Sequence, residues 1–448
     1  MLAFCACVAT PEPAATPQAR STTPTAVSEA IETPTEYSVA SSESATAPAP
    51  LPVNSAPAPI FASSGHPELD AWRDDFALRA VSSGRDPSTV KLLLDGVKPL
   101  KVYLPAPGQS DKNLTAAENQ AEFAKPIWEY VASAVNDTRK TKGRRFYSEM
   151  DTLFEELELN FAVDREAILA IWAMETNFGG YIGDFDGPET LANMATEGRR
   201  RGLAERELFA MMTILERGEA RRQDLISGWA GAMGQTQFMP SVFLTRAVDW
   251  DGDGKKDLWK SKADALASAA NYLALAGYSK GQPWGVEVTV SDGFDYSIAD
   301  GRHLRGNDWL ELGVMPAQGR QIPLESGARL WLPAGANGPK YLIYSNFDVF
   351  LNYNRANAYA FSVGLLSDAF AGIPGVQASW PKSDGRLNRD EIKQMQAALN
   401  AKGYPAGVVD GIAGTGTRKA LQSFQKDNGL IADGYPTRAI LPYVLQGQ

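Results

Sequence analysis

One glutamate, Glu175, lies where its carboxyl group could act as an acid toward a glycosidic oxygen. Residues 164–176 are predicted to form a helix that begins at Asp164 and ends before Gly179-Gly180. On a 3.6-residue period, Glu175 shares one face of this helix with three apolar side chains, those of Ile168, Ile171 and Trp172. A carboxyl group with apolar walls tends to keep its proton near neutral pH, as a general acid must. The alternative interpretation is that Glu175 ends the helix and faces water.

Histidine and cysteine are scarce, and this disfavours several kinds of hydrolase. The two histidines, His66 and His303, lie far apart, so they do not supply the neighbouring ligands of a zinc hydrolase. Neither histidine has a sequence context that suggests a Ser-His-Asp triad. Both cysteines, Cys5 and Cys7, lie at the extreme N-terminus, which disfavours a Cys-His nucleophile. Carboxylates remain the best candidates for hydrolytic chemistry, and we expect no organic cofactor.

An acidic loop resembles the first half of an EF-hand. The run from Asp249 to Lys255 places carboxylates at positions one, three and five, those of Asp249, Asp251 and Asp253. Lys255 offers its backbone carbonyl, whereas Lys260 at position twelve cannot ligate. Asp264, at the start of the next predicted helix, would close the site. Because these ligands are hard oxygens, we expect a structural Ca²⁺ ion; the alternative is an acidic turn without metal.

The overall charge and hydropathy limit the class of protein. The net charge of −10 and the pI near 5.0 argue against a nucleic-acid partner, which would require a basic face. No stretch is long and apolar enough to predict a transmembrane helix. Hydrophobic residues make up 44% of the chain, which is enough for a sizeable core.

Composition divides the 448 residues into three predicted parts. Residues 1–64 form a signal remnant and a disordered tether rich in Ala, Pro, Thr and Ser. Residues 65–380 form the main, catalytic domain. Residues 381–448 form a small C-terminal module, near the lower size limit for an independent core.

The first residues suggest a membrane connection. The run from Met1 to Cys7 is short and apolar but lacks a basic start, so it could be the end of a signal peptide. Phe4-Cys5-Ala6-Cys7 weakly resembles a bacterial lipobox with Cys7 as the lipidated residue. The alternative is two ordinary thiols. A lipid anchor followed by a tether would suit a protein that reaches outward from a membrane.

The predicted elements of the main domain are mostly helices, followed by a β-rich insertion. Helices are expected over residues 68–83, 118–138 (with a break at Pro126), 144–159, 164–176, 205–218, 261–276 and 356–370. Strands are expected over residues 286–290, 328–332 and 340–344. The C-terminal module is expected to contain helices over 389–402 and 416–428. This mixture predicts an α+β fold.

Three phrases resemble the lytic murein transglycosylase B family. They are Ala173-Met-Glu-Thr-Asn-Phe-Gly179, Ala230-Gly-Ala-Met-Gly-Gln-Thr-Gln-Phe-Met-Pro-Ser241 and Asn352-Tyr-Asn-Arg-Ala-Asn-Ala-Tyr359. Their order and spacing are specific, and the resemblance covers about residues 68–375. The C-terminal module resembles a peptidoglycan-binding domain of the first type, through Gln396-Ala-Ala-Leu, Val409-Asp410-Gly411 and Phe424-Gln425. The resemblance implies a lysozyme-like, mainly helical catalytic domain and a helical wall-binding domain.

The family resemblance implies a chemistry that needs only one carboxylate. The family cleaves the bond between N-acetylmuramic acid and N-acetylglucosamine without adding water, and leaves a 1,6-anhydromuramoyl end. Glu175 would protonate the leaving oxygen and then deprotonate the C6 hydroxyl that closes the anhydro ring. Most glycosidases instead use two carboxylates. Asp184 and Asp186 are nearby in sequence, but we expect them in a solvated loop.

The resemblance also implies residues that contact the substrate. The amide of Gln237 suits the acetamido groups of amino sugars. Tyr353 and Asn354 match residues of the family's cleft, and Arg199 and Arg200 align with an arginine pair that contacts glycan or peptide carboxylates. The alternatives are a tight packing loop for Gln237, helix capping for Tyr353 and Asn354, and a solvated basic run for the arginines.

One position departs from the family pattern. A serine commonly precedes the aromatic-Ala-Gly-Ala-Met phrase, but here that position is Gly228, with Ser227 one residue earlier. A serine contact near the acid, from Ser227, is therefore a weaker expectation. The departure keeps open a catalytically inactive wall-binding scaffold, and a water-adding muramidase is the other alternative. For the enzyme, we expect peptidoglycan strands as partner and a periplasmic location in a Gram-negative bacterium, with an outer-membrane anchor at Cys7.

Overall fold

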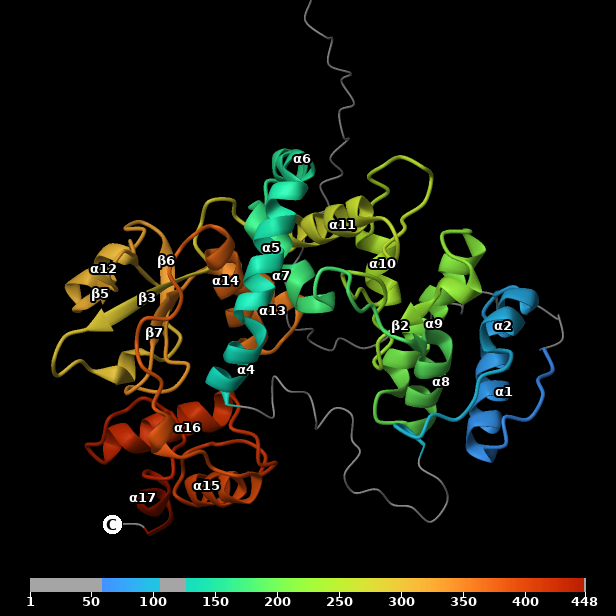
Figure 1. Ribbon diagram of the computed structural model, residues 1–448. Helices are drawn as coiled ribbons and strands as arrows, with labels where there is room; N and C mark the ends of the chain where they lie inside the picture. The colour runs from blue at the N-terminus through green and yellow to red at the C-terminus, as the bar shows by residue number, and fades with distance from the viewer. Residues whose placement is uncertain (1–58, 105–125, 447–448) are drawn as a thin grey trace, which may run out of the picture. The chain divides into compact units, whose positions relative to one another are not determined.

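The computed structural model of the protein describes residues 59–104 and 126–446 (Figure 1). Cys7, nearly all of the predicted tether and the first part of the predicted helix 118–138 lie outside these residues. Within the described ranges, no helix combines the length and the apolar character needed to cross a membrane.

Helices from two separate parts of the chain build one core. They are α1 (Pro67–Ser82), α2 (Pro87–Leu94), α8 (Gly187–Glu197) and α9 (Arg201–Glu216). The side chain of His66 caps α1 by accepting a hydrogen bond from the Leu69 amide at 3.3 Å, and Asp86 caps α2 through the Thr89 amide at 3.0 Å. Their facing apolar side chains are fully buried and include Phe76, Leu93 and Leu208.

The helix that carries Glu175, α7 (Arg165–Thr176), lies at the centre of a second group of helices (Figure 1). Every residue from Ala167 to Ala173 is fully buried, so α7 is a core helix that is covered on all sides. Its neighbours are α5 (Asp137–Glu149), α6 (Asp151–Phe161), α11 (Lys262–Leu275) and α14 (Asn357–Phe370). Two further helices pack on α14, namely α4 (Ile127–Ala134) and α13 (Ser345–Tyr353).

Residues 285–343 form the β-rich insertion, an antiparallel five-stranded sheet in the order β4-β6-β7-β3-β5. Its strands are β3 (Gly285–Val290), β4 (Leu304–Arg305), β5 (Val314–Pro316), β6 (Gly327–Trp331) and β7 (Lys340–Ile343). The helix α12 (Gly306–Glu311) adds the buried Trp309, whose Nε1 donates a hydrogen bond to the Ala328 carbonyl at 2.9 Å. Trp309 lies in one core with Val286, Leu330 and Leu342.

Short elements hold the segment 228–239 in place. The strand β1 (Phe185–Asp186) pairs antiparallel with β2 (Ile226–Ser227), directly before this segment. Backbone bridges then join Met233 to Ser227 and to Phe238, which close the segment on itself. The helix α10 (Pro240–Arg246) follows and begins with proline, which suits the first helical position. The segment is therefore anchored at both of its ends.

The C-terminal module contains α15 (Arg389–Ala401), α16 (Thr415–Asp427) and α17 (Leu441–Gln446) around a small apolar core. Two buried glutamines play the same part in it. Gln396 donates to Oδ1 of Asp410 at 2.9 Å and accepts from the Gly411 amide. Gln425 donates to Oδ1 of Asp433 at 2.9 Å and accepts from the Gly434 amide. Each glutamine thus fastens one Asp-Gly turn to its helix.

The α+β prediction is confirmed, but two predicted helices are wrong in their bounds. In place of helices over 118–138 and 144–159, the described chain forms α4, α5 and α6. The chain breaks at Asn136, because its side chain accepts a hydrogen bond from the Arg139 amide and so begins a new helix. Met150, with φ of −118°, separates α5 from α6. The sequence analysis also omitted α2, α8 and α13.

Candidate active site

Glu175 lies in the last turn of α7 and is half-buried. The hydroxyl of Tyr359, from α14, donates a hydrogen bond to its Oε1 atom. Burial, and then the negative charge of Glu175, raise the pKa of Tyr359 well above its ordinary value. The phenol therefore keeps its proton and donates a hydrogen bond to Glu175 throughout the physiological pH range.

Tyr353 brings a second phenol toward the same carboxylate. Burial and then the charge of Glu175 also raise the pKa of Tyr353 well above its ordinary value. Its hydroxyl donates to the backbone carbonyl of Thr236 at 2.6 Å, and its ring meets that of Tyr272 edge-on at 4.7 Å. Asn354 turns the chain from α13 into α14 by accepting a hydrogen bond from the Ala356 amide. This turn delivers both phenols to one site.

The chain reverses directly after Glu175. Asn177 and Phe178 have φ of 51° and 63°, and Gly179 has φ of 69°. At Gly179 a Cβ atom would lie 2.4 Å from Oε1 of Gln235, so this position needs glycine for space as well as for backbone conformation. Asp164, at the other end of α7, makes no capping hydrogen bond. Its carboxylate instead accepts from the Tyr278 hydroxyl at 3.0 Å.

Gln235 links the segment 228–239 to α7, and the sequence analysis missed it. Its Oε1 accepts a hydrogen bond from Nε1 of Trp172 at 3.2 Å, and its carbonyl accepts from the hydroxyl of Thr176 at 2.6 Å. Gln235 is only 4% exposed, so it is a positioning residue and cannot face substrate. The signal was present in the phrase Gly-Gln-Thr-Gln, which contains two amides, of which only Gln237 was chosen.

Gln237 is half-buried with φ of 49°. Its amide nitrogen donates to the backbone carbonyls of Ile182 at 3.1 Å and Gly234 at 2.9 Å. Its Oε1 lies 3.0 Å from the point where a Cβ atom on Gly228 would be. The amide therefore ties the segment 228–239 to residue 182, and its predicted contact with a sugar stays a prediction.

The remaining predicted contacts lie in contrasting surroundings. Ser227 is fully buried, and its hydroxyl donates to the Gly228 carbonyl at 3.0 Å, so it is directed away from solvent. Arg199 is exposed and forms an ion pair with Glu197. Arg200 stands at the start of α9 and is half-buried. Their contacts with substrate stay predictions.

Asp184 and Asp186, the first acidic residues after Glu175 in the chain, already have partners. Oδ1 of Asp184 accepts a hydrogen bond from the hydroxyl of Tyr181 at 2.9 Å. Asp186 forms a bidentate ion pair with Arg222, at 2.6 and 2.8 Å, and caps α8. A carboxylate held in this way by the two nitrogens of an arginine is fixed in position. Neither group is poised as a second catalytic carboxylate.

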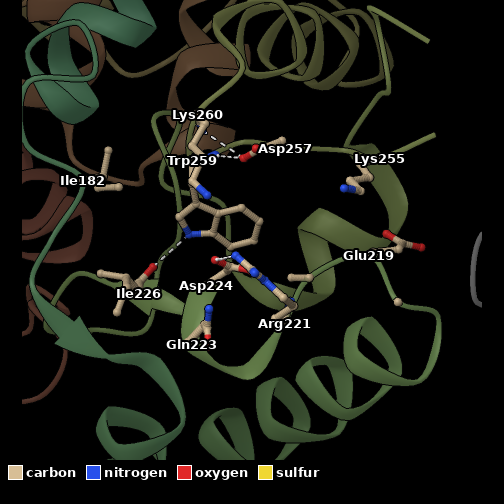
Figure 2. A pocket seen from close by; sticks show the side chains of 12 residues that line it. Ile182, Glu219, Arg221, Gln223, Asp224, Ile226, Lys255, Asp257, Trp259 and Lys260 are labelled. Carbon is tan, nitrogen blue, oxygen red and sulfur yellow. Dashed lines mark hydrogen bonds and ion pairs between the residues drawn. The ribbon is translucent and has the colours of Figure 1, made fainter. Parts of the chain in front are cut away.

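A cavity of about 420 Å³ lies next to the Gln237 segment (Figure 2). The side chain of Ile182 lines it, while the carbonyl of Ile182 holds the Gln237 amide. Trp259 and the ends of two loops, residues 218–226 and 255–260, form the rest of the wall. The cavity is therefore distinct from the surroundings of Glu175, and Ile182 connects it to the Gln237 segment.

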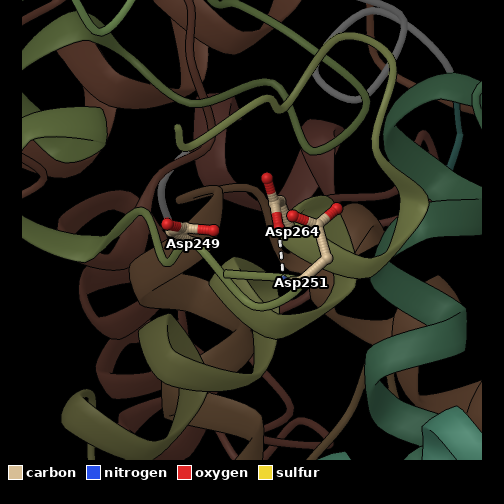
Figure 3. A group of neighbouring side chains, drawn as sticks. All are labelled: Asp249, Asp251 and Asp264. Carbon is tan, nitrogen blue, oxygen red and sulfur yellow. Dashed lines mark hydrogen bonds between the residues drawn. The ribbon is translucent and has the colours of Figure 1, made fainter. Parts of the chain in front are cut away.

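The acidic loop brings three of the predicted metal ligands together (Figure 3). Carboxylate oxygens of Asp249, Asp251 and Asp264 lie within 4.8 Å of one another. Asp264 is fully buried, accepts hydrogen bonds from the Trp250 and Asp257 amides at 2.8 Å, and has its pKa raised by burial. Three converging carboxylates, one of them buried, fit a hard cation such as Ca²⁺.

The other two predicted metal ligands are placed differently. Asp253 lies outside the group of converging carboxylates, and its Oδ1 accepts a hydrogen bond from the Lys255 amide at 2.9 Å. Its predicted role as a metal ligand stays a prediction. The carbonyl of Lys255 stays a prediction.

The comparisons with known proteins agree with this geometry. Residues 68–368, well over half of the chain, match the sequence model of the transglycosylase SLT domain family. The chain belongs to this family. Residues 388–441 match a family described as a peptidoglycan binding domain. The predicted lysozyme-like α+β fold with a helical C-terminal domain is confirmed by these matches.

Known members of the family resemble the chain to different extents. The membrane-bound lytic murein transglycosylase B of Escherichia coli (strain K12) is 31% identical over 224 residues, which are 47% of this chain and 58% of that protein. The chain thus matches less than two thirds of this curated relative. SltB3 from Pseudomonas aeruginosa, in complex with NAG-anhNAM-pentapeptide, is 40% identical with a TM-score of 0.77, over 84% of this chain and 99% of that one.

A second solved structure shares the fold alone. The Escherichia coli lytic transglycosylase Slt35, in complex with calcium, is 24% identical with a TM-score of 0.55, over 68% of this chain and 93% of that one. Together with SltB3, it shows that the arrangement of helices around α7 is the family's arrangement.

Proposed function

We propose that this protein is a lytic transglycosylase that cleaves the MurNAc-GlcNAc bond of peptidoglycan and leaves 1,6-anhydromuramoyl ends. One observation carries the proposal: Glu175 is a half-buried carboxylate at the end of a core helix and is held by the phenol of Tyr359. The family membership and the 40% identity to SltB3, whose complex contains an anhydro sugar, support it.

Glu175 acts as both acid and base in this proposal. In the first step its carboxyl proton passes to the glycosidic oxygen, and the bond from that oxygen to C1 of the muramyl residue breaks. In the second step the carboxylate takes the proton of the C6 hydroxyl, whose oxygen bonds to C1. The substrate supplies its own nucleophile, so no water is consumed and no second carboxylate is required. The occupied state of Asp184 and Asp186 agrees with this scheme.

Tyr359 and Tyr353 hold and surround the carboxylate. Because Tyr359 is buried and stays protonated, it donates to the ionised form of Glu175 between the two steps. Gln237 and the loop that it fixes would form one wall for the acetamido sugars. These roles follow from the contacts already described and are parts of the same proposal.

The experiment that tests this function is mass spectrometry of purified peptidoglycan after digestion with the protein. Muropeptides with an anhydro end, lighter by one water than the hydrolysed form, are the expected result. Reducing ends would mean a water-adding muramidase. An absence of products, with wall binding retained, would mean a catalytically inactive scaffold.

The acidic loop is proposed to hold a structural Ca²⁺ ion through Asp249, Asp251 and Asp264. Bound there, the ion would neutralise converging carboxylates and fix the segment 249–264, whose Asp257 amide and Trp250 amide already bind Asp264. The same segment also binds Gln235, whose backbone N–H donates a hydrogen bond to the Leu258 carbonyl at 2.8 Å. The ion would therefore stabilise the loop behind the Gln237 segment and take no part in bond cleavage.

The layout and location of the chain are proposed as follows. Residues 65–380 form the catalytic domain and residues 381–448 the wall-binding domain, after a tether over 1–64. A periplasmic location, with a lipid anchor at Cys7, would place the catalytic domain at its polymer. Palmitate labelling of the full chain and of a Cys7→Ala variant tests the anchor. If Cys7 is lipidated, only the unchanged chain should carry the label.

A further inference from the structure

The cavity next to the Gln237 segment has the size and construction of a ligand site (Figure 2). Its volume of about 420 Å³ falls within the range of about 300–1,000 Å³ of small-molecule pockets. Its wall combines the aromatic ring of Trp259 and the apolar side chains of Ile182 and Ile226 with the polar groups of Gln223 and Lys260. A few polar groups around an apolar floor are the usual construction of such a pocket.

Trp259 provides a fixed aromatic surface. Its Nε1 donates a hydrogen bond to the Ile226 carbonyl at 3.2 Å, which holds the edge of the ring. Phe243 packs against it with ring centroids 5.8 Å apart. Trp259 is nevertheless only half-buried, and it lies in the middle of the lining residues in Figure 2. A rigid, half-buried indole offers a flat apolar surface at little entropic cost to a ligand with its own flat face.

Two of the three anionic groups of the lining are paired with cations. Asp224 accepts two hydrogen bonds from Arg221, at 2.7 and 3.0 Å. Glu219 pairs with Lys256 at 3.5 Å. The third, Asp257, accepts hydrogen bonds at its Oδ1 from the backbone amides of Trp259 and Lys260, at 3.0 and 2.9 Å. Because Lys256 is added from outside the lining, the cations around the cavity outnumber the anions by one.

Two lysines of the lining, Lys255 and Lys260, have no ion-pair partner among the described residues. Both side chains are exposed. A ligand that enters the pocket therefore meets two ammonium groups beside an aromatic ring. This combination favours a ligand that has an apolar ring face and a carboxylate.

We propose that this cavity is an accessory site for an anionic muramyl peptide, with the sugar ring against Trp259 and a stem-peptide carboxylate at Lys255 and Lys260. The choice of ligand rests on the proposed function, because that polymer joins acetamido sugars to carboxylate-bearing peptides. Ile182 connects the two sites, since its side chain lines the cavity and its carbonyl holds Gln237. The accessory site therefore selects strands by their peptide, next to the segment that carries the predicted sugar contact.

The test is a titration followed by NMR, with the full chain carrying Glu175→Gln so that no ligand is consumed. The indole N–H signal of Trp259 is assigned by its loss in Trp259→Phe. N-acetylmuramyl-L-alanyl-D-glutamate is the charged probe and tri-N-acetylchitotriose is the neutral probe. We expect the Trp259 signal to shift and saturate with the charged probe, and to shift less at equal concentration of the neutral one.

Variants distinguish the pocket from other binding surfaces. Lys260→Glu changes an exposed side chain, so the variant should fold. The Kd for the charged probe, measured from the Trp259 signal, should rise about tenfold, as expected for the loss of a charged hydrogen bond. The matched control is Lys262→Glu, which makes the same charge reversal two residues further along the chain, at an exposed side chain that does not line the cavity. It should leave the response within about twofold.

Three results would overturn the accessory site: no response of Trp259 to the charged probe, an equal response to the neutral probe, or equal effects of Lys260→Glu and Lys262→Glu. The digestion experiment is separate, because it reports on bond cleavage with the Glu175 carboxylate intact. Reducing ends in that experiment would refute the proposed function and leave the Trp259 titration to be judged by its own outcomes.

Discussion

The hydroxyl of Tyr359 donates a hydrogen bond to Oε1 of Glu175 across a separation of 184 residues in the chain. The two side chains meet because α14 packs along α7. Tyr359 is 3% exposed, so this hydrogen bond is shielded from solvent and its geometry is fixed by the core. The single proposed catalytic group is thus held from a second helix.

Replacement of the catalytic carboxylate should abolish turnover. Glu175→Gln keeps the shape of the side chain but removes its ability to give and take a proton, so the rate of bond cleavage should fall by about 10²–10⁴-fold or more. Release of soluble muropeptides from peptidoglycan measures the rate. Thermal unfolding and sedimentation with insoluble peptidoglycan should stay unchanged. Turnover near the normal rate would remove Glu175 from the mechanism.

Loss of the Tyr359 hydroxyl should slow the reaction without removing it. Tyr359→Phe keeps the buried ring but takes away one donor to the ionised carboxylate, so kcat should fall by about tenfold. The alkaline limb of the pH–rate profile, which follows loss of the Glu175 proton, should move to higher pH, because the carboxylate form of Glu175 loses a stabilising hydrogen bond. A purely structural role would lower the melting temperature and leave the profile in place. The matched control is Tyr344→Phe, a buried tyrosine in the core of the insertion.

Removal of divalent cations should destabilise the protein if the acidic loop holds calcium. At a free Ca²⁺ concentration of about one hundred times Kd, the free energy of unfolding should exceed that of the chelated protein by about 2.7 kcal/mol. Calorimetry with Ca²⁺ and with a chelator measures the difference. Asp264→Asn should remove most of it, whereas Asp253→Asn, outside the converging group, should retain it. An equal melting temperature in both solutions would contradict a calcium site.

The buried pair of Asp368 and Arg320 predicts a pH dependence of stability. Burial raises the pKa of Asp368 from 3.8 to about 6, despite the guanidinium of Arg320 at 3.0 Å. Between these two values the folded protein binds more protons than the unfolded chain, so this group stabilises the fold at low pH. That stability is lost as pH rises through about 6, and it amounts to at most about 3 kcal/mol.

The measurement for this pair is the free energy of unfolding in denaturant at pH 4.5 and pH 7. Asp368→Asn should flatten the dependence between these values, because the amide has no carboxyl proton to lose. Asp348→Asn is the matched control, because Asp348 also pairs with an arginine, Arg329, but is 45% exposed. An unchanged slope in Asp368→Asn would contradict the assignment.

Removal of the C-terminal module should separate binding from chemistry. Without residues 381–448, sedimentation with insoluble peptidoglycan should weaken, whereas turnover of short soluble glycans should stay within about threefold. The truncation removes two side chains that contact the rest of the protein. Asp433 accepts a hydrogen bond from the Ala336 amide, and Gln422 donates one to the Tyr296 carbonyl, so the folding of the truncated protein must be checked by calorimetry. A folded truncation that loses both activities would contradict the modular layout.

Local sequence patterns predicted those helices, strands and loops that depend on residues close together in the chain. The core helix that carries Glu175 and the strands at 285–290, 327–331 and 340–343 follow from hydrophobic periodicity and from glycine and proline boundaries. The catalytic role of Glu175 was implied by the family resemblance. The acidic loop follows from the spacing of its aspartates. Periodicity failed around Asn136, where one side chain that caps a helix overrides the apolar pattern.

Only the tertiary structure decided how these parts meet. Three features depend on which side chains pack together in the folded protein. The Tyr359 hydroxyl binds Glu175, the side-chain amide of Gln235 ties the 228–239 segment to Trp172, and Asp253 lies outside the group of converging carboxylates. The burial of Ser227 depends on the same packing. Sequence spacing determines which residues share a helix face or a turn, whereas partners far apart in the chain are selected by packing, which no local period records.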